Sequence, residues 1–287
     1  MKTELNQLPE IVIVGSRGYL GAFLEGYFRS RGYAVVGVSS ADCDFLQASA
    51  VEALFSRFDD RPRVILFLQV INKGQDNSFE AYQSNVQMVK NLLTHISETS
   101  AHYLVYASSV DVYGSHPPAV ITESSPIAPD TWYGLAKYSC EWMIGHNSVF
   151  SQKSCVLRFP GIFGPAPNDK SVIGKLVRSF REEGRAILSG QGTVRRDFVS
   201  TSDIARLIEM LTQKPYCGVL NVVRGQSERM IDVAKITADI LKVPFAATFV
   251  EADPGRDFDL VFDSAKLRTI LPGFSFSSLA DGIRDYL

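Results

Sequence analysis

The first half of the chain alternates short apolar runs with longer stretches in which apolar residues recur every three or four positions. This alternation is typical of strands joined by helices, in which the helices cover a parallel sheet. The short runs predict strands over 11–14, 34–38, 64–70, 103–108 and 156–159. The pattern therefore predicts an α/β fold with a doubly wound parallel sheet.

Two of the longer stretches place their apolar residues on one helical face. One lies between the first two strands and is formed by Leu20, Phe23, Leu24, Tyr27 and Phe28. The other precedes the fourth strand and is formed by Phe79, Tyr82, Val86, Val89 and Leu93. Because residues at this spacing fall on one side of a helix, each stretch predicts a helix with one buried face.

The pattern changes after Gly161. The second half predicts a longer helix over 171–183, short strands around 187–188, 196–199 and 219–223, and a last helix with its cap at Ser277 or Ser278. We therefore expect a first domain over 1–160 and a smaller α/β domain over 161–287, parts of which return to the first sheet.

The composition describes a chain that can bury a core. Its 287 residues are 46% hydrophobic, and its net charge of −2 provides no basic field for nucleic acid or an anionic membrane surface. No apolar run approaches the roughly 18 residues that span a bilayer, and residues 1–10 lack the apolar core of a signal peptide. We expect a cytoplasmic protein that binds neither nucleic acid nor membrane.

The cysteines and histidines show no pattern of a disulfide framework or a metal site. Cys43, Cys140, Cys155 and Cys217 are widely spread with no CxxC pair, and the histidines have no ligand spacing. We predict no bound metal, and we interpret Cys140 and Cys155 as small buried core residues.

Three glycines follow the first predicted strand and open the first predicted helix. Gly15, Gly18 and Gly21 form a GxxGxxG pattern, in which glycine permits a tight turn and lets the backbone approach a pyrophosphate. The amides of the helix N-terminus face the bound anion. In this setting the loop predicts a Rossmann-type dinucleotide site. The further cofactor contacts expected within the loop are Arg17, Tyr19 and Leu20.

The kind of dinucleotide is decided near the end of the second strand, where an acid would hold the ribose 2′-hydroxyl of NAD and a basic group would favour the phosphate of NADP. This strand is followed by Ser39 and Ser40, and Arg17 lies in the glycine loop. A positive charge and two hydroxyls favour NADP. NAD stays open, because Asp42 and Asp44 lie about 20 residues past the loop, where the fingerprint often places its acid.

A tyrosine and a lysine lie four residues apart in a predicted helix. Tyr133 and Lys137 therefore share one helical face, where the ammonium is expected to bring the pKa of the phenol toward the neutral range. Ser108 and Ser109 end the fourth predicted strand, at the carboxyl edge where open α/β sheets bind ligands. A hydroxyl there can bond the substrate oxygen that exchanges a proton with Tyr133.

Together these motifs resemble the extended short-chain dehydrogenase/reductases, in the group of NAD(P)-dependent sugar-nucleotide epimerases, dehydratases and reductases. The matching segments, in the order of the family, are 15–21, 44–45, 85–86, 108–114, 133–137, 158–165, 196–199, 203–205 and 263–266. The resemblance implies that Tyr133 donates or accepts the proton, that Lys137 binds the nicotinamide ribose, and that Ser109 positions the reacting oxygen. The remaining cofactor contacts that we predict are Ser39, Ser40, Asp44, Phe45 and Gln69.

Departures from the family pattern bear on the reaction. Dehydratases of this group carry two acidic residues, or a serine and a glutamate, just after the hydroxyl residue; here those positions are Val110 and Asp111. The single carboxylate disfavours 4,6-dehydration. It leaves Asp111 either as a catalytic acid or base or as a turn-capping residue. Gln69 stands where the family usually has alanine beside the cofactor.

The resemblance also implies that the first domain binds the dinucleotide and the second binds the substrate. Arg196 is expected to contact the diphosphate of a nucleoside-diphosphate sugar, because a guanidinium fork matches phosphate oxygens. The alternative is a surface ion pair with Asp197. Arg256 is a second candidate for substrate binding, with surface packing as its alternative. Asn85 is expected to keep a structural hydrogen bond.

These features favour an NADPH-dependent reductase of a keto nucleoside-diphosphate sugar, with Tyr133 as the proton donor. The first alternative is an NAD-dependent epimerase that oxidises and re-reduces one sugar carbon. The second is a non-catalytic NAD(P) sensor, which the presence of Ser109, Tyr133 and Lys137 disfavours. The family resemblance further implies a homodimer through helices at 79–98 and 131–147.

Overall fold

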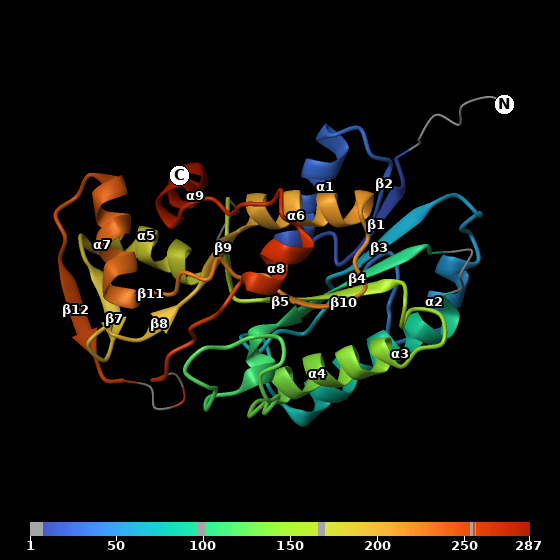
Figure 1. Cartoon of the computed structure of the whole chain (residues 1–287), viewed down its shortest axis with the longest axis horizontal. Coiled ribbons are helices and arrows are strands. Elements are labelled where there is room, and N and C mark those ends of the chain that lie inside the picture. The colour runs from blue at the N-terminus through green and yellow to red at the C-terminus, as the bar shows by residue number, and fades with distance from the viewer. Residues whose placement is uncertain (1–7, 97–100, 166–169, 253–254, 256) are drawn as a thin grey trace. The chain divides into compact units, whose positions relative to one another are not determined.

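The computed structural model describes residues 8–96, 101–165, 170–252, 255 and 257–287 (Figure 1). The chain divides into two compact units that share its sequence in alternating segments. Unit 1 comprises Met1–Val112, Pro129–Leu157 and Ile208–Val219, and unit 2 comprises Tyr113–Ala128, Arg158–Leu207 and Leu220–Leu287. The expected division at residue 160 into a cofactor domain and a substrate domain stays a prediction.

A six-stranded sheet has the order β10-β5-β4-β3-β1-β2. Its strands are β1 (Glu10–Val14), β2 (Val35–Val38), β3 (Arg63–Phe67), β4 (Tyr103–Ser109), β5 (Ser154–Phe159) and β10 (Gly218–Asn221). The strands β2, β1, β3 and β4 are joined by parallel pairs, in which Val12 lies opposite Val36 on one side and Ile65 on the other. The predicted α/β fold with a central parallel sheet is therefore confirmed.

The third strand is shorter than the apolar run that predicts it. β3 ends at Phe67, so the prediction of a strand over 64–70 is wrong for its last three residues. The amide of Leu68 still donates to the carbonyl of Val14 at 2.9 Å. The next amide nitrogen, that of Gln69, would lie only 2.9 Å from a Cβ on Gly15. The chain thus leaves the sheet where two backbones approach each other, which the apolar pattern does not report.

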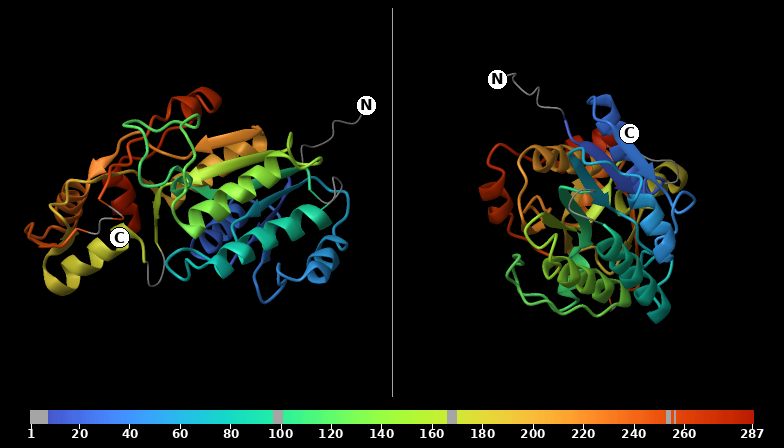
Figure 2. Two further views of the ribbon diagram at one scale, coloured as in Figure 1. Left: turned by 90° about the horizontal axis from the view of Figure 1, so that it is seen from below. Right: turned by 90° about the vertical axis from the view of Figure 1, so that its right-hand side faces the viewer.

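Helices cover both faces of the sheet in unit 1 (Figures 1 and 2). α1 (Tyr19–Ser30) lies on one face, and α2 (Ala48–Phe55), α3 (Phe79–His95) and α4 (Trp132–Gly145) lie on the other. On this second face one apolar cluster joins strand residues such as Val12 to Phe55, Leu92 and Ile144 of the three helices. No helix in the described part of the chain has the length and apolar content to cross a membrane.

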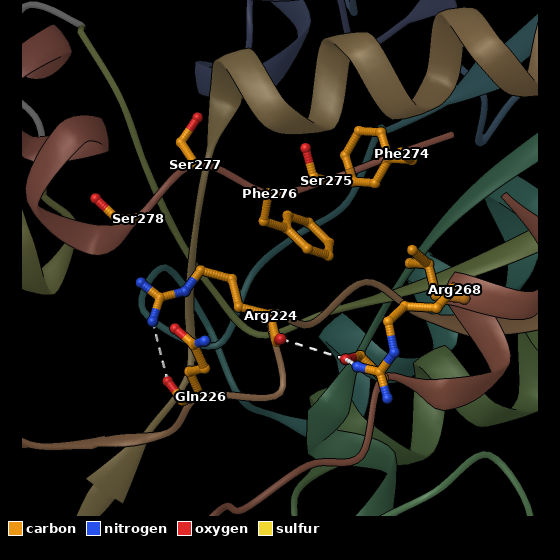
Figure 3. A pocket seen from close by; sticks show the side chains of 10 residues that line it. Arg224, Gln226, Arg268, Phe274, Ser275, Phe276, Ser277 and Ser278 are labelled. Atoms are coloured by element: carbon orange, nitrogen blue, oxygen red, sulfur yellow. Dashed lines mark hydrogen bonds between the residues drawn. The ribbon is translucent and has the colours of Figure 1, made fainter. Parts of the chain in front are cut away.

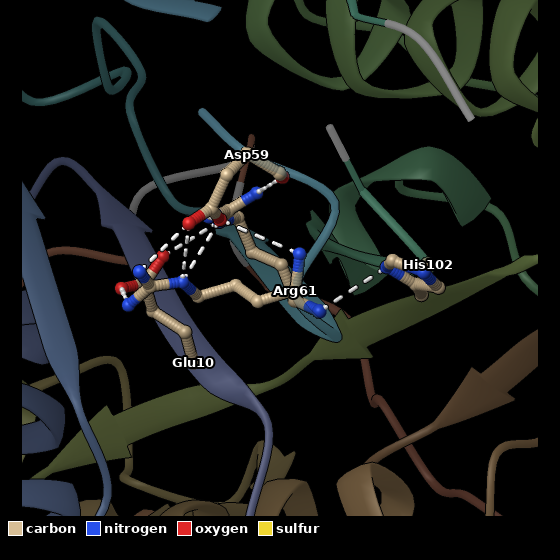
Figure 4. A network of polar contacts seen from close by, with 5 residues as sticks. Glu10, Asp59, Arg61 and His102 are labelled. Atoms are coloured by element: carbon tan, nitrogen blue, oxygen red, sulfur yellow. Dashed lines mark hydrogen bonds and ion pairs between the residues drawn. The ribbon is translucent and has the colours of Figure 1, made fainter. Parts of the chain in front are cut away.

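A buried ion pair lies at the amino ends of β1 and β3 (Figure 4). Arg63 is 1% exposed, and its Nε donates to Glu10 Oε2 at 2.6 Å. Its guanidinium lies 4.2 Å from the ring centroid of Phe58 and donates to Asp59 Oδ1 at 3.1 Å. The network lies at the amino ends of the strands. The predicted site residues lie at the opposite edge of the sheet, at the carboxyl ends of the strands.

Unit 2 is built on two-stranded sheets and a separate apolar core. The pairs are β7 (Ala186–Ser189) with β12 (Ala247–Val250), β8 (Arg195–Arg196) with β11 (Glu228–Arg229), and β6 (Gly161–Phe163) with β9 (Phe198–Ser200). The helices are α5 (Val172–Glu183), α7 (Met230–Leu241), α8 (Ala265–Ile270) and α9 (Leu279–Tyr286), and α6 (Thr201–Gln213) begins in unit 2 and ends in unit 1. Phe180, Val233 and Ile283 join α5, α7 and α9 in the core. Ser278 caps α9, as one of the two predicted alternatives, by accepting the amide of Asp281 at 3.1 Å.

The segment 196–199 is two strands, so the prediction of a single strand is wrong. Arg196 ends β8 and Phe198 begins β9. Between them Asp197 is 2% exposed, and its carboxylate accepts the amides of Arg224 at 3.1 Å and Gly225 at 2.9 Å. The buried Asp197 side chain binds backbone amides of unit 2. The chain therefore passes from one sheet to another at Asp197, although the polar and apolar residues around it alternate as in a single strand.

Candidate active site

The carboxyl edge of the sheet in unit 1 carries most of the predicted site residues. Parallel strands end at the same edge, where open α/β sheets bind ligands. The glycine loop follows β1, Ser39 and Ser40 follow β2, Gln69 follows β3, and Ser109 ends β4. Tyr133 and Lys137 are in α4. The elements that precede each residue therefore place these side chains at one edge.

The glycine loop is tightly closed on its own backbone. Gly15 has a φ of +93°, which glycine adopts without strain. A Cβ on Gly21 would lie 2.1 Å from the carbonyl oxygen of Gly15, so a larger residue there would push the loop away from the helix. Gly18 is the N-cap residue of α1 and donates its amide to the Gly15 carbonyl at 2.9 Å. The helix then begins at Tyr19 and Leu20, with the positive end of its dipole at the loop.

The residues around this loop fit a dinucleotide. The glycines leave the backbone bare for a pyrophosphate, and the side-chain oxygen of Gln69 is buried without a hydrogen-bond partner. The backbone of Gln69 is adjacent to Gly15 of this loop. Because a buried acceptor without a donor is costly, a ligand that donates a hydrogen bond here would satisfy it. Gln69 is therefore retained as a predicted cofactor contact.

A carboxylate lies at the end of β2. Asp42 accepts the Ser39 amide at 2.8 Å and the Ser39 hydroxyl at 2.5 Å. These bonds, followed by the charge of Arg17, hold the pKa of Asp42 below its usual value. Arg17 and Ser40 are exposed. The structure thus places an acidic side chain, Asp42, and a basic one, Arg17, near this end of the strand. Asp42 is one of the two acids for which the sequence left NAD open as the alternative to NADP.

The two following residues have different surroundings. Asp44 is exposed and accepts the amide of Leu46 at 3.0 Å. Phe45 is fully buried, with its ring edge-on to Phe67 at a centroid distance of 5.4 Å, and its carbonyl accepts Nδ2 of Asn91 at 2.8 Å. The Phe45 side chain therefore anchors this segment in the core. A cofactor contact through Asp44, or through the backbone of Phe45, stays a prediction.

Ser109 and Tyr133 meet at the site. The Ser109 hydroxyl lies near the phenol of Tyr133 and favours its ionised form. The short helix η1 (Val110–Tyr113) follows β4, and α4 begins against it: a Cβ on Gly134 would lie 2.6 Å from the carbonyl oxygen of Asp111. Glycine at 134 therefore lets the first turn of α4 approach the end of β4, and this approach brings the phenol to Ser109.

Lys137 is buried one turn further along α4. Its Nζ donates to the carbonyl of Ala107 at 2.5 Å and lies 5.7 Å from the ring centroid of Tyr133 and 4.9 Å from that of Tyr106. Burial lowers the pKa of Lys137 to about 8. The ammonium is thus held beside the phenol by a backbone carbonyl, in the arrangement that the four-residue spacing predicts.

The expected effect on the phenol is wrong for the protein alone. Burial, followed by the negative charge of Asp111, raises the pKa of Tyr133, and the nearby Ser109 hydroxyl offsets this only in part. The protein by itself therefore keeps the phenol protonated. A positive charge on a bound group would favour the phenolate, as an oxidised nicotinamide does.

Two further residues complete the surroundings of Lys137. The Ser108 hydroxyl donates to the carboxylate of Glu141, and both side chains are buried. Glu141 follows Lys137 by four residues on α4, and its negative charge favours the ammonium. A carboxylate near a buried cation offsets part of the free-energy cost of burying its charge. Glu141 was not predicted from the sequence, although the i, i+4 spacing from Lys137 is the signal that indicates it.

Asp111 forms an ion pair with Lys73. The side chains are 21% and 46% exposed, respectively, and Lys73 belongs to the loop 68–78 that joins β3 to α3. The amide of Asp111 donates to the Ser109 hydroxyl at 3.2 Å. Lys73 was not predicted from the sequence, because nothing in the pattern of an irregular loop shows which side chain turns toward the site.

In unit 2, Arg196 is half-buried. Its guanidinium donates to the carbonyl of Arg195 at 2.8 Å and to that of Phe258, and it lies 5.1 Å from the Phe258 ring centroid. A contact of Arg196 with a substrate diphosphate stays a prediction. Arg256, the second predicted substrate residue, lies outside the described residues.

Other residues of the predicted motifs serve the fold. Within unit 2 the hydroxyl of Tyr113 donates to Asn221 Oδ1 at 2.8 Å and accepts from Arg158 Nη1 at 2.8 Å. All three side chains are buried. In unit 1 Asn85 exchanges two hydrogen bonds with the backbone of Ile71, which is the structural role expected from the sequence.

Unit 2 also contains a pocket of about 360 Å³ (Figure 3). Arg224, Arg268 and Phe276 are among its lining residues, and Arg224 donates to the carbonyl of Gln226 at 3.1 Å. None of the predicted site residues lines it. Among the residues that the structure describes, no three His, Cys, Asp or Glu side chains are grouped to hold a metal ion.

The parallel sheet, the glycine loop and the Ser–Tyr–Lys group define a dinucleotide-binding α/β protein. The chain belongs to the NAD dependent epimerase/dehydratase family, whose model matches residues 11–222. It is therefore an enzyme of the NAD(P)-dependent oxidoreductase or epimerase type, as predicted. A Bacillus subtilis (strain 168) protein described as an uncharacterized UDP-glucose epimerase, YtcB, is 23% identical over 96% of this chain and 95% of its own length. A dTDP-glucose 4,6-dehydratase of Streptomyces niveus is 27% identical over 70% of this chain and 61% of its own.

Solved structures share the fold along nearly the whole chain. The UDP-glucose 4-epimerase of Thermotoga maritima with UDP-glucose has a TM-score of 0.85 at 18% identity, over 96% of this chain and 97% of its own. The UDP-glucose 4-epimerase of Thermus thermophilus in complex with NAD has a TM-score of 0.81 at 20% identity, with the same shares covered. At these identities the similarity establishes the fold.

Proposed function

We propose that the chain is an NAD-dependent epimerase of a nucleoside-diphosphate sugar, with UDP-sugars as its substrates. The observation that carries the proposal is the grouping of Ser109, Tyr133 and the buried Lys137, whose Nζ lies 5.7 Å from the Tyr133 ring centroid, at the edge that also holds the glycine loop. Relatives named as UDP-glucose epimerases support epimerisation over the keto-sugar reduction that the sequence favoured. The dehydratase reaction has less support, because only Asp111 of the two expected acidic positions is acidic.

Tyr133 exchanges the proton of the reacting sugar hydroxyl in this proposal. Ser109 holds the same oxygen, while Tyr133 accepts the proton as the hydroxyl becomes a carbonyl and returns it when the carbonyl is reduced. The chemistry that a bound nicotinamide would supply is reversible hydride transfer at the sugar carbon. Because the keto sugar turns its other face before the second transfer, the carbon inverts and no net oxidation occurs.

Lys137 and Glu141 prepare the site for this exchange. With a pKa of about 8, Lys137 is mostly protonated at neutral pH, and Glu141 supplies its counter-charge. We propose that the ammonium binds the nicotinamide ribose, as the family resemblance implies. Its position beside the Tyr133 ring then keeps a positive charge near the phenol during proton transfer.

We propose NAD rather than NADP as the cofactor. Asp42 lies at the end of β2, and its carboxylate accepts hydrogen bonds from Ser39 that stabilise the negative charge. An acid in this position suits a ribose hydroxyl and repels a phosphate. The same carboxylate reduces the attraction that Arg17 alone would offer to a 2′-phosphate.

We further propose that unit 1 holds the cofactor, that Arg196 and Arg256 bind the substrate diphosphate, and that the protein forms a homodimer through α3 and α4. Phe79 and Trp132, at the first turns of these helices, are 45% and 40% exposed, and their rings contact each other at 5.1 Å. Light scattering of the purified protein tests the dimer.

The deciding experiment incubates the purified protein with NAD⁺ and each of several UDP-sugars and follows formation of the C4 epimer by chromatography. We expect epimer without net formation of NADH. Replacement Tyr133→Phe should lower turnover by about 10²- to 10⁴-fold and leave NAD⁺ binding unchanged. No epimer from any UDP-sugar, together with NADPH oxidation by a 4-keto sugar nucleotide, would establish the reductase instead.

A further inference from the structure

The loop 68–78 is anchored on both sides of Lys73. On one side Asn85 Oδ1 accepts the Ile71 amide at 2.8 Å, and Asn85 Nδ2 donates to the Ile71 carbonyl at 2.9 Å. On the other side Asn77 Oδ1 accepts the amide of Tyr133 at 3.0 Å. One anchor is therefore the residue that carries the phenol. These bonds fix where the Lys73 backbone lies relative to Tyr133.

The side chain of Lys73 pairs with Asp111, which belongs to the same group of contacts as the phenol. The ammonium donates to Asp111 Oδ2, and the amide of Asp111 donates to the Ser109 hydroxyl at 3.2 Å. Lys73, Asp111 and Ser109 thus form one continuous series of contacts within unit 1, and both Asp111 and Ser109 act on the pKa of the Tyr133 phenol.

The charge of Asp111 acts on Tyr133. After burial, this carboxylate is the largest influence that raises the pKa of the phenol. An unpaired carboxylate at this place would oppose loss of the proton still further. The ammonium of Lys73 offsets the negative charge of Asp111 directly. Because the Lys73 side chain is 46% exposed, solvent screens the ion pair and the offset is partial.

We propose that Lys73 is a positioning residue of the active site, whose ion pair with Asp111 sets the pH range in which Tyr133 exchanges its proton. The proposal rests on the proposed function, in which Tyr133 is the proton-exchanging residue. Lys73 acts through Asp111 and does not touch the reacting atoms. Its role is to balance the charge of Asp111 near the phenol, in addition to the positive charge that Lys137 supplies from α4.

The other titratable groups on the elements around Tyr133 leave this balance to Lys73. They are Lys137, Tyr138, Cys140 and Glu141 on α4, Tyr103 and Tyr106 on β4, Asp76 on the loop, and Glu80, Tyr82, Lys90 and His95 on α3. The carboxylate of Asp76 accepts the Ser78 amide at 2.9 Å, and the Tyr82 hydroxyl lies 3.4 Å from that of Ser139. Lys137 donates to the Ala107 carbonyl. Within the described residues the ion pair that Asp111 forms is the one with Lys73.

The test compares Lys73→Met, Asp111→Asn and the double variant by the pH dependence of kcat/KM for UDP-glucose epimerisation with NAD⁺. Loss of Lys73 leaves Asp111 uncompensated, so the acidic limb should move up by about one pH unit. Loss of Asp111 removes the opposing charge, so the limb should move down. The double variant should return close to the wild type. Lys214→Met, an exposed lysine just after α6, is the matched control and should not shift the limb.

Two results would overturn the proposal. A rise in KM for Lys73→Met with an unmoved limb would assign Lys73 to substrate binding. A shift of the same size in Lys73→Met and in the double variant would show that Asp111 is not the group through which Lys73 acts.

A second measurement separates this proposal from the proposed function. Proton release on NAD⁺ binding, followed with an indicator dye in weak buffer, reports ionisation of the phenol without any sugar and should vanish in Tyr133→Phe. In Lys73→Met the release should move to higher pH by about one unit, and in Asp111→Asn to lower pH. If no UDP-sugar is epimerised, the proposed function fails while this measurement still decides the role of Lys73. Unmoved release in both variants would overturn that role.

Discussion

The backbone amide of Tyr133 donates a 3.0 Å hydrogen bond to the side-chain oxygen of Asn77. The bond joins the loop 68–78 to the first turn of α4, where the helix has amides without partners inside the helix. Thr131 satisfies the neighbouring amide, that of Gly134, at 3.0 Å. The start of the helix that carries the phenol is therefore capped from two segments, one of them the loop that carries Lys73.

Replacement Asn77→Ala removes one of these caps. We expect the free energy of unfolding to fall by about 1 kcal/mol, the usual cost of losing a helix N-terminal cap. Urea denaturation measures the change, and Asn77→Asp, which keeps an acceptor oxygen, is the matched control. Equal stability of Asn77→Ala and the wild type would show that water replaces the bond at no cost.

Cofactor preference should depend on Asp42. Removal of its charge in Asp42→Asn leaves Arg17 unopposed at the end of β2, so affinity for NADP⁺ should rise about tenfold relative to NAD⁺. Arg17→Ala should move the ratio in the opposite direction. Calorimetric titration with both cofactors measures it. A ratio unchanged in both variants would mean that neither charge faces the adenosine ribose.

Lys137 should make stability depend on pH. Its pKa is about 8 in the folded protein against a usual value of 10.5, so between these values the unfolded chain binds more protons. The free energy of unfolding therefore rises with pH in this window. From about pH 7 to about pH 10 the wild type should gain about 2 kcal/mol relative to Lys137→Met. Urea denaturation of both proteins across this range tests it, and a constant difference would contradict it.

The buried charges of Arg63 and Glu10 should stabilise the fold only when both are present. Arg63→Leu leaves the Glu10 carboxylate buried without its partner and should cost about 3–5 kcal/mol. The double variant, with leucine at both positions, should recover most of this loss. Arg61, which is 55% exposed and 3.4 Å from Glu10, provides the control: Arg61→Ala should cost less than about 1 kcal/mol. Equal losses in the single and double variants would count against a buried charge as the cause.

Local patterns predicted the parts of the fold that local interactions determine. β1 and α1 are marked by an apolar run, the glycine loop and a full helical stripe, and both lie where expected. α2 has only eight residues, too few for a stripe to repeat, and it was missed. The change of sheet at Asp197 depends on amides of Arg224 and Gly225 that are distant in sequence, so no window around 196–199 contains the cause.

The candidate site shows the same division between residues that local patterns indicate and residues that they do not. Tyr133 and Lys137 are linked by helical spacing, and Ser109 by its place at the end of a strand, so a sequence can indicate them. Lys73 reaches Asp111 from an irregular loop, and Asp42 turns back onto Ser39. Both contacts follow from loop conformations that the hydrophobic pattern does not encode. The raised pKa of Tyr133 likewise follows from burial, which spacing alone does not reveal.

The outermost position of β10 has a consequence for how the protein is made. Its partner β5 ends at Phe159, whereas β10 begins at Gly218, so the ribosome makes the whole segment 160–217, which includes a large part of unit 2, before β5 gains its neighbour. Until then the nascent sheet has an open hydrogen-bonding edge, which is a template for mispairing with other chains. Slow translation between these two strands should therefore lower the yield of native protein, and a chaperone that shields that edge should restore it.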